Sequence, residues 1–131
     1  MAISNAMVIG GGIGGLATAA CLSRRGMAVT LLEQAPAIAE VGAGLQISPN
    51  GMAVLRAMGL EPQLKARSAV RGEAVVLQDY KAGKQVARLD LMRGQADHPY
   101  MFMHRADLID VLLGAAKRGN VPIELGVQSA A

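Results

Sequence analysis

A glycine-rich turn after a short apolar run is the feature of this sequence that most restricts its fold. Residues 6–9 are apolar, and Gly10, Gly12 and Gly15 follow at the G-x-G-x-x-G spacing. In a βαβ unit the first glycine permits a sharp turn, the second lets a ligand approach the backbone, and the third lets the helix pack closely on the strand. The N–H groups at the start of the helix, near Gly14, can then bind an anion. The stretch therefore predicts a dinucleotide-binding strand, turn and helix.

A second strand and an acidic residue follow in the order that such a unit needs. Gly26 is placed to end the helix, and residues 28–32 form an apolar, partly β-branched run typical of a strand buried on both faces. Glu33 ends this run, 18 residues after Gly15. A carboxylate there can accept hydrogen bonds from a ribose diol and would repel a 2′-phosphate. We therefore expect a nucleotide whose adenosine ribose carries no phosphate.

Composition narrows the class of protein further. The 131 residues fit one domain, and the single cysteine, Cys21, suits a core position in a cytoplasmic protein. A net charge of +3 with two tyrosines, one phenylalanine and no tryptophan argues against nucleic-acid binding. The apolar N-terminus lacks the basic segment of an export signal, and its glycines would weaken a membrane helix, so we expect no membrane partner. No cluster of His, Cys and acidic residues has metal-ligand spacing.

The chain beyond Glu33 departs from simple strand and helix alternation. Ser48 and Pro49 predict the start of a short helix that ends at Gly59. Residues 73–78 and 85–91 predict a β-hairpin with one solvated face, and residues 100–103 predict a further short strand. The later elements are a helix whose apolar face runs from Leu108 to Ala116, and a strand at 121–125. The fold class is therefore α/β: a Rossmann-like unit with a parallel sheet built from residues 5–10, 28–33 and 121–125, and an inserted β-hairpin.

Four segments together resemble those of a known enzyme family. GGGIGG, LLEQAP, GAGLQISPNGMAVLRAMGL and MHRADL occur in the order seen in FAD-dependent aromatic-ring monooxygenases, notably the salicylate, hydroxypyridine and hydroxybenzoate hydroxylases. The resemblance covers nearly all of the chain. It implies FAD as cofactor, NAD(P)H as reductant, molecular oxygen, and a small aromatic substrate.

The resemblance also implies roles for particular residues. Those implied to bind the cofactor are Gly10, Gly12, Gly14 and Gly15 at the diphosphate, Glu33 and Gln34 at the adenosine ribose, Gly44, Leu45 and Gln46 beside the flavin ring, Arg105 on the flavin side, and Ser129 near adenine. Ser129 replaces the aliphatic residue usual in the family. His104 is interpreted as a packing or supporting residue, and His98 as exposed. No residue is assigned a catalytic role, and no metal is expected.

Gln46 departs from relatives that carry a histidine at this position. A glutamine can hydrogen-bond but cannot act as a base near neutral pH, so substrate deprotonation is expected elsewhere or not at all.

The chain is also much shorter than members of this family. We interpret residues 1–131 as an incomplete N-terminal portion of the FAD-binding domain, truncated before the substrate domain and inactive alone. Two alternatives stay open: a small NAD-binding reductase, for which Glu33 is suitable but the long excursion before the next long helix is not, and a non-enzymatic remnant with exposed apolar surface.

Overall fold

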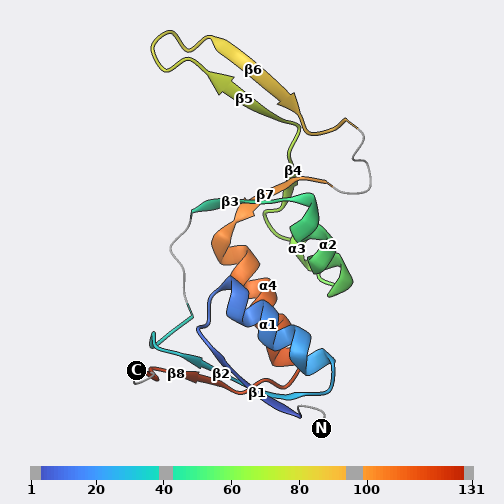
Figure 1. Ribbon diagram of the computed structural model, residues 1–131, viewed down its shortest axis with the longest axis vertical. Coiled ribbons are helices and arrows are strands. Elements are labelled where there is room, and N and C mark those ends of the chain that lie inside the picture. The colour runs from blue at the N-terminus through green and yellow to red at the C-terminus, as the bar shows by residue number, and fades with distance from the viewer. Residues whose placement is uncertain (1–3, 39–42, 94–98, 129–131) are drawn as a thin grey trace. The chain divides into compact units, whose positions relative to one another are not determined.

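The computed structural model describes residues 4–38, 43–93 and 99–128. The chain divides into two compact units (Figure 1). The first unit comprises residues 1–43 and 105–131, and the second unit comprises residues 44–104.

The first unit contains the parallel sheet that the sequence predicts. Its strands are β1 (Asn5–Ile9), β2 (Ala28–Glu33) and β8 (Ile123–Leu125), in the order β1-β2-β8. β1 ends one residue earlier than predicted, because Gly10 has a φ of +100° and turns the chain. β8 begins after Pro122, whose carbonyl accepts a hydrogen bond of 2.9 Å from the Leu31 N–H. The parallel arrangement predicted for the three segments is therefore confirmed.

Two helices, α1 (Ile13–Arg24) and α4 (Arg105–Arg118), pack together against one face of this sheet (Figure 1). α1 ends before Gly26, which adopts the predicted left-handed conformation with a φ of +81°. Cys21 of α1 is half-buried rather than fully buried. Fully buried apolar side chains form the core between helices and sheet: Leu16, Ala19, Ala20, Leu31, Ile109, Leu112 and Ala116.

The second unit contains a small antiparallel sheet. It has the order β3-β7-β4, from β3 (Gly44–Ile47), β7 (Met101–His104) and β4 (Val70–Arg71). The helices α2 (Pro49–Ala57) and α3 (Glu61–Lys65) accompany it. The buried apolar side chains of this unit come from both helices and from the strands: Ile47, Met52, Leu55, Met58, Leu60, Leu64, Met101 and Met103.

Local signals fix both ends of α2. The Ser48 hydroxyl accepts a hydrogen bond of 3.4 Å from the Gly51 N–H, and Pro49 occupies the first turn. Gly59 follows the helix with a φ of +71°. Glu61 of α3 lies 2.7 Å from the Arg56 guanidinium and 3.0 Å from the Lys65 ammonium, which lowers the pKa of its carboxyl to about 2. This ion pair links α2 to α3 on the surface.

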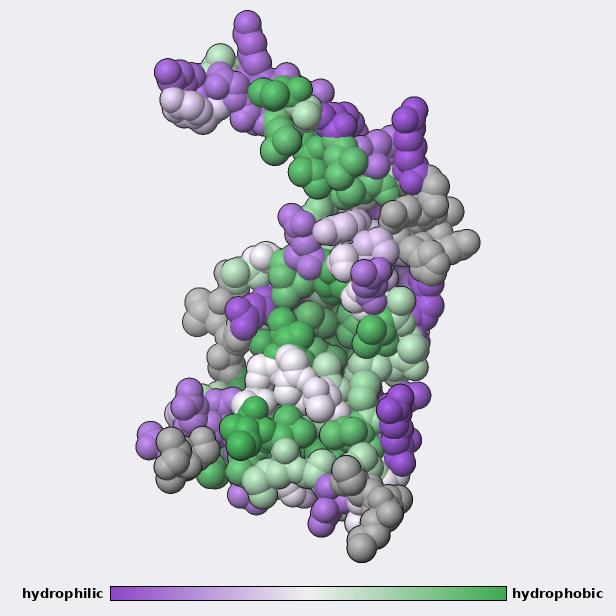
Figure 2. Space-filling model, in the orientation of Figure 1, coloured by the Kyte–Doolittle hydropathy of each residue, from purple (hydrophilic) through white to green (hydrophobic). Residues whose placement is uncertain are grey.

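The predicted β-hairpin is present as β5 (Ala74–Gln78) and β6 (Gln85–Asp90), with Gly83 in its turn at a φ of +64°. Every residue of β6 is exposed, and Leu77 and Leu89 are each about three-fifths exposed. In Figure 2, hydrophobic atoms run along this hairpin. The alternating sequence predicts one solvated face and one buried face. Within the described residues, neither face of the hairpin is buried.

Candidate functional site

Two glycines shape the glycine turn, one through its backbone conformation and the other because no space is left for a side chain. Gly10 follows β1 with positive φ, and its N–H donates a 2.7 Å hydrogen bond to the Leu32 carbonyl. A Cβ on Gly15 would lie 1.8 Å from the Gly10 carbonyl oxygen. α1 can therefore start against the end of β1 only with a glycine at position 15, as the motif predicts.

Gly12 of the motif and the nearby Gly14 face open space. A Cβ built on Gly12 or Gly14 would meet no other atom within 4 Å. Gly12 is the N-cap of α1 and provides no side-chain cap, and the first turn of α1 contains no acidic residue. The helix dipole and the first-turn N–H groups therefore face a cradle that admits an anionic group close to the backbone. A diphosphate fits this arrangement.

Glu33, at the carboxyl end of β2, lies directly against the glycine turn. Its carboxylate accepts a hydrogen bond from the Ala35 N–H at 2.8 Å and another from the Gly11 N–H. These two bonds, the Ala35 bond first, lower the pKa of the Glu33 carboxyl. Each carboxylate oxygen keeps acceptor capacity for one further donor, such as a ribose hydroxyl.

A hollow of about 150 Å³ adjoins this carboxylate in the first unit. Its lining includes the turn, the Glu33 side chain and the segment after β2: Gly11, Gly12, Glu33, Ala35, Ala37, Ile38 and Ile109. The structure thus brings the predicted anion cradle and the predicted ribose acceptor together around one opening.

Fewer contacts define the positions of the remaining candidate residues of the first unit. Gln34 is exposed beside Glu33. Arg105 is exposed at the first position of α4, where its N–H donates a 3.0 Å hydrogen bond to the Ala43 carbonyl. Ser129 lies outside the described residues, as does His98.

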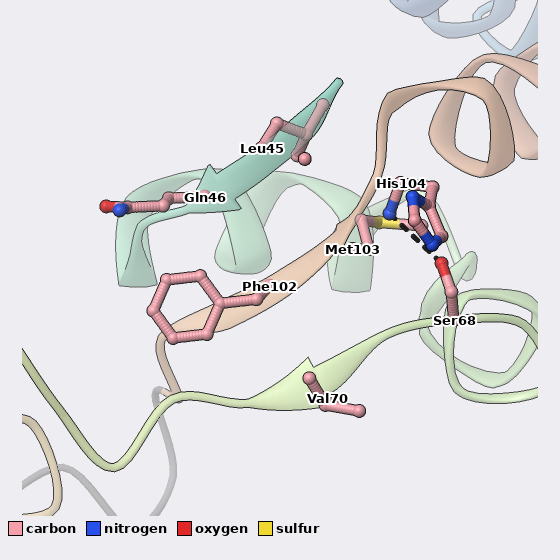
Figure 3. A pocket seen from close by; sticks show the side chains of 8 residues that line it. Leu45, Gln46, Ser68, Val70, Phe102, Met103 and His104 are labelled. Atoms are coloured by element: carbon pink, nitrogen blue, oxygen red, sulfur yellow. Dashed lines mark hydrogen bonds between the residues drawn. The ribbon is translucent and has the colours of Figure 1, made fainter. Parts of the chain in front are cut away.

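The second unit holds Gly44, Leu45 and Gln46 on β3. These residues line a pocket of about 350 Å³ together with Ser68, Val70, Phe102, Met103 and His104 (Figure 3). In the strand register Gln46 and Val70 both pair with Phe102, so these three side chains lie on the same face of the sheet. Gln46 is exposed, while Leu45 on the opposite face is half-buried.

Phe102, Val70 and Ser68 are pocket residues that the sequence analysis did not find. The Phe102 ring lies 6.3 Å from the Tyr100 ring, and a Cβ on Gly72 would come within 2.5 Å of it. Side chains alternate between the two faces of a strand, and Met101 and Met103 are both buried. This alternation could have placed Phe102 on the opposite face of the sheet from the two methionines. No comparable signal marks Ser68.

His104 is exposed, so its interpretation as a packing residue is wrong for its side chain. Its backbone N–H donates a 3.0 Å hydrogen bond to the Ser68 hydroxyl, which lies beside it in Figure 3. As the last residue of β7, His104 turns its side chain to the outer face of the sheet.

The described residues lack two other kinds of feature. They contain no group of three His, Cys, Asp or Glu side chains placed to share a metal ion. None of their helices combines the length and apolar character that crossing a bilayer requires.

Comparison with known sequences gives one consistent result. The sequence model of a family described as "FAD binding domain" matches residues 4–130. The chain is 41% identical over 119 residues to the 3-hydroxybenzoate 6-hydroxylase of Polaromonas naphthalenivorans (strain CJ2), a match that covers 88% of this chain and 30% of that enzyme. The chain thus spans about a third or less of the length of the curated relatives it matches.

Solved structures agree with the sequence matches. The tetrameric form of 2-methyl-3-hydroxypyridine-5-carboxylic acid oxygenase superposes with a TM-score of 0.81 at 26% identity, covering 96% of this chain and 32% of that one. CtdE, solved in complex with FAD and a substrate, superposes with a TM-score of 0.76 at 26% identity, covering 95% of this chain and 30% of that one.

Proposed function

Because the chain belongs to the FAD binding domain family, we propose that it is the N-terminal, cofactor-binding portion of an NAD(P)H-dependent monooxygenase that hydroxylates a small aromatic compound. The observation that carries this proposal is the open glycine cradle at the start of α1 with the Glu33 carboxylate beside it. The chain spans about 30% of the matched hydroxylase, so turnover requires the remaining polypeptide. We also propose that residues 1–131 form an incomplete N-terminal portion of the FAD-binding domain.

Within the proposal each candidate residue has a physical task. The N–H groups around Gly12 and Gly14 hold the diphosphate, while Gly10 and Gly15 fix the turn that presents them. Glu33, oriented by backbone N–H groups, accepts from the ribose hydroxyls, with Gln34 beside it. Bound FAD would supply hydride acceptance from NAD(P)H and activation of molecular oxygen.

Three further contacts complete the cofactor site in the proposal. Gly44, Leu45 and Gln46 on β3 flank the flavin ring. The Arg105 guanidinium, at the start of α4, provides a planar fork for a phosphate of the cofactor. Ser129, which the resemblance assigns to the adenine ring, lies outside the described residues.

Gln46 constrains the chemistry of the substrate. Its exposed amide projects on the same face as Phe102 and Val70, which are suited to contact a planar ring. The amide can orient a polar substituent of that ring but cannot remove a proton near neutral pH. We therefore propose a substrate that is deprotonated by another group of the complete enzyme or that needs no deprotonation. A cytoplasmic location is also proposed, since the only cysteine is unpaired.

A chimera tests this function. Residues 4–130 of this chain would replace the matching segment of the P. naphthalenivorans hydroxylase, and FAD content and NAD(P)H oxidation with 3-hydroxybenzoate would be measured. We expect a folded flavoprotein whose NAD(P)H oxidation rises when the aromatic compound is added. A chimera that folds but retains no FAD would contradict the proposal. The same chimera with Gly15→Ala serves as the control, since that change disrupts the turn itself.

A further inference from the structure

Gly72, directly after β4, is a buried glycine whose backbone conformation does not require glycine. Its φ lies outside the left-handed region that favours this residue type. Its N–H donates a 2.7 Å hydrogen bond to the Tyr100 carbonyl, so the backbone continues the pairing of β4 with the segment of β7. A glycine in such a place often marks a close approach of another group to the backbone. The reason for glycine at this position therefore lies in the space above it.

The Phe102 ring occupies that space. A Cβ on Gly72 would lie 2.5 Å from the Cε2 atom of the ring, 3.1 Å from its Cζ atom and 3.2 Å from a δ-methyl group of Leu91. Phe102 reaches Gly72 diagonally across the strand pair, because its direct register partner is Val70. The aromatic ring therefore rests on bare backbone, in a position that any side chain on residue 72 would contest.

The position of this ring sets one end of the pocket in the second unit. Gln46, Val70 and Phe102 share one face of the sheet and line this pocket of about 350 Å³. Figure 3 shows the Phe102 ring extending away from Ser68 and His104, which line the other part of the pocket. Sites for small molecules occupy roughly 300–1,000 Å³. A pocket of this size therefore cannot admit the Phe102 ring and still hold an aromatic compound.

A methyl group at position 72 would drive the ring into the pocket. The nearest atoms that it meets belong to the far end of a side chain, which can rotate, and not to the backbone. A phenylalanine χ1 has few staggered positions, and in a strand they lean the ring along the strand in different directions. Gly72 and Ser68 lie two residues to either side of Val70, so they are the two diagonal neighbours of Phe102 on this side. A ring that leaves Gly72 therefore turns toward Ser68.

We propose that Gly72 is a positioning residue for substrate specificity. By leaving bare backbone beneath the Phe102 ring, it holds that ring at the end of the pocket and keeps the pocket open to the ring of an aromatic substrate. Gly72 does not itself line the pocket, so it acts through Phe102 alone. The assignment rests on the proposed function, since it takes this pocket as the substrate site.

NMR spectroscopy of the 131-residue chain tests the ring position without cofactor or substrate. In the wild type we expect nuclear Overhauser effects between the Phe102 ring protons and the Gly72 α protons. In Gly72→Ala we expect the ring protons to show these effects with the Ser68 β protons, while the far-ultraviolet circular dichroism stays that of the wild type. Absence of the wild-type contact, or a variant whose ring does not move toward Ser68, would overturn the proposal. An unfolded variant would also overturn it, because the ring and not the backbone must make room for the methyl group.

Steady-state kinetics of the chimera with the P. naphthalenivorans hydroxylase test the consequence for the substrate. We expect Gly72→Ala to raise KM for 3-hydroxybenzoate at least about tenfold and to change kcat less than about threefold, because the pocket loses space and no reacting group. In the Phe102→Leu background the same change at Gly72 should alter KM less than about twofold. Gly114→Ala on α4, where a Cβ would lie 3.3 Å from the flexible Arg118 guanidinium, is the matched control and should keep the wild-type KM.

The outcomes separate this inference from the proposed function. An active chimera whose KM does not respond to Gly72→Ala would contradict the role of Gly72 alone. An increase in KM that persists in full in the Phe102→Leu background would also contradict it, since the effect would not pass through the ring. A chimera that retains no FAD would instead contradict the proposed function, while the NMR measurement still decides where the Phe102 ring lies.

Discussion

At the scale of single residues, the two kinds of glycine in the turn behave differently toward substitution. Gly15→Ala forces a Cβ to within 1.8 Å of the Gly10 carbonyl oxygen, whereas a Cβ on Gly14 meets nothing within 4 Å. We predict that Gly15→Ala lowers the free energy of unfolding by more than about 3 kcal/mol, while Gly14→Ala changes it by less than about 1 kcal/mol. Urea denaturation followed by circular dichroism measures both values. Equal losses for the two variants would show that the turn is not packed as described.

Glu33 gives the fold a dependence on pH. Because hydrogen bonds from Ala35 and Gly11 lower the pKa of its carboxyl, its stabilising contribution is present above the ordinary value of 4.5 and is lost as the pH falls toward the lowered value. We predict that Glu33→Gln has a lower melting temperature than the wild type at pH 7, and that the difference shrinks below about pH 4.5. Glu124→Gln, at an exposed position of β8, is the control. A difference that stays constant with pH would contradict this role for the carboxylate.

The sequence identified most of this turn but not all of its bonding. Positions 10 and 15 require glycine, and position 33 requires a carboxylate. Requirements for particular residue types of this kind are visible in a sequence motif. The Gly11 N–H, which holds Glu33 in place, is a backbone donor, and any residue type carries such a donor. Ser68 and Val70 were missed for a related reason: Ser68 bonds to His104, and Val70 pairs with Phe102, each across more than 30 residues.

At the scale of secondary-structure elements, the β5–β6 hairpin is the least supported part of the described chain. A two-stranded hairpin alone is marginally stable in water, and its apolar residues are largely exposed here. We predict that limited proteolysis first cuts between Asp79 and Lys84, leaving α1 and α4 intact. Mass spectrometry of the first fragments tests this expectation. Initial cleavage within α1 or α4 would instead show that the first unit is the weaker one.

Most elements were predicted from apolar runs, periodic patterns or caps, including the short strands β7 and β8, which have four and three residues. The elements β3, β4 and α3 were not predicted. β3, β4 and α3 have four, two and five residues, which is too few for periodicity. Their positions depend on contacts far away in the sequence, such as the pairing of Val70 with Phe102.

At the scale of the whole molecule, the chain combines a well-formed cofactor turn with apolar surfaces that lack cover. The family match over residues 4–130 accounts for the turn, and the chain spans only about 30% of the matched hydroxylase. Met7 and Ile9 on β1 belong to such a surface, as does the hairpin. Sequence alone predicted the α/β class and the cofactor, but which surfaces stay bare depends on three-dimensional packing.

The most direct test of the central claim is the affinity of the 131-residue chain for FAD, compared with that of Gly12→Asp by equilibrium dialysis. Gly12 is an N-cap without a side-chain cap, so aspartate there should keep or slightly raise stability. Its carboxylate would occupy the open cradle and repel a diphosphate. We predict that the wild type binds FAD and that the folded variant binds at least about tenfold more weakly. Equal affinities, or a compact wild-type chain that does not bind FAD, would contradict the account.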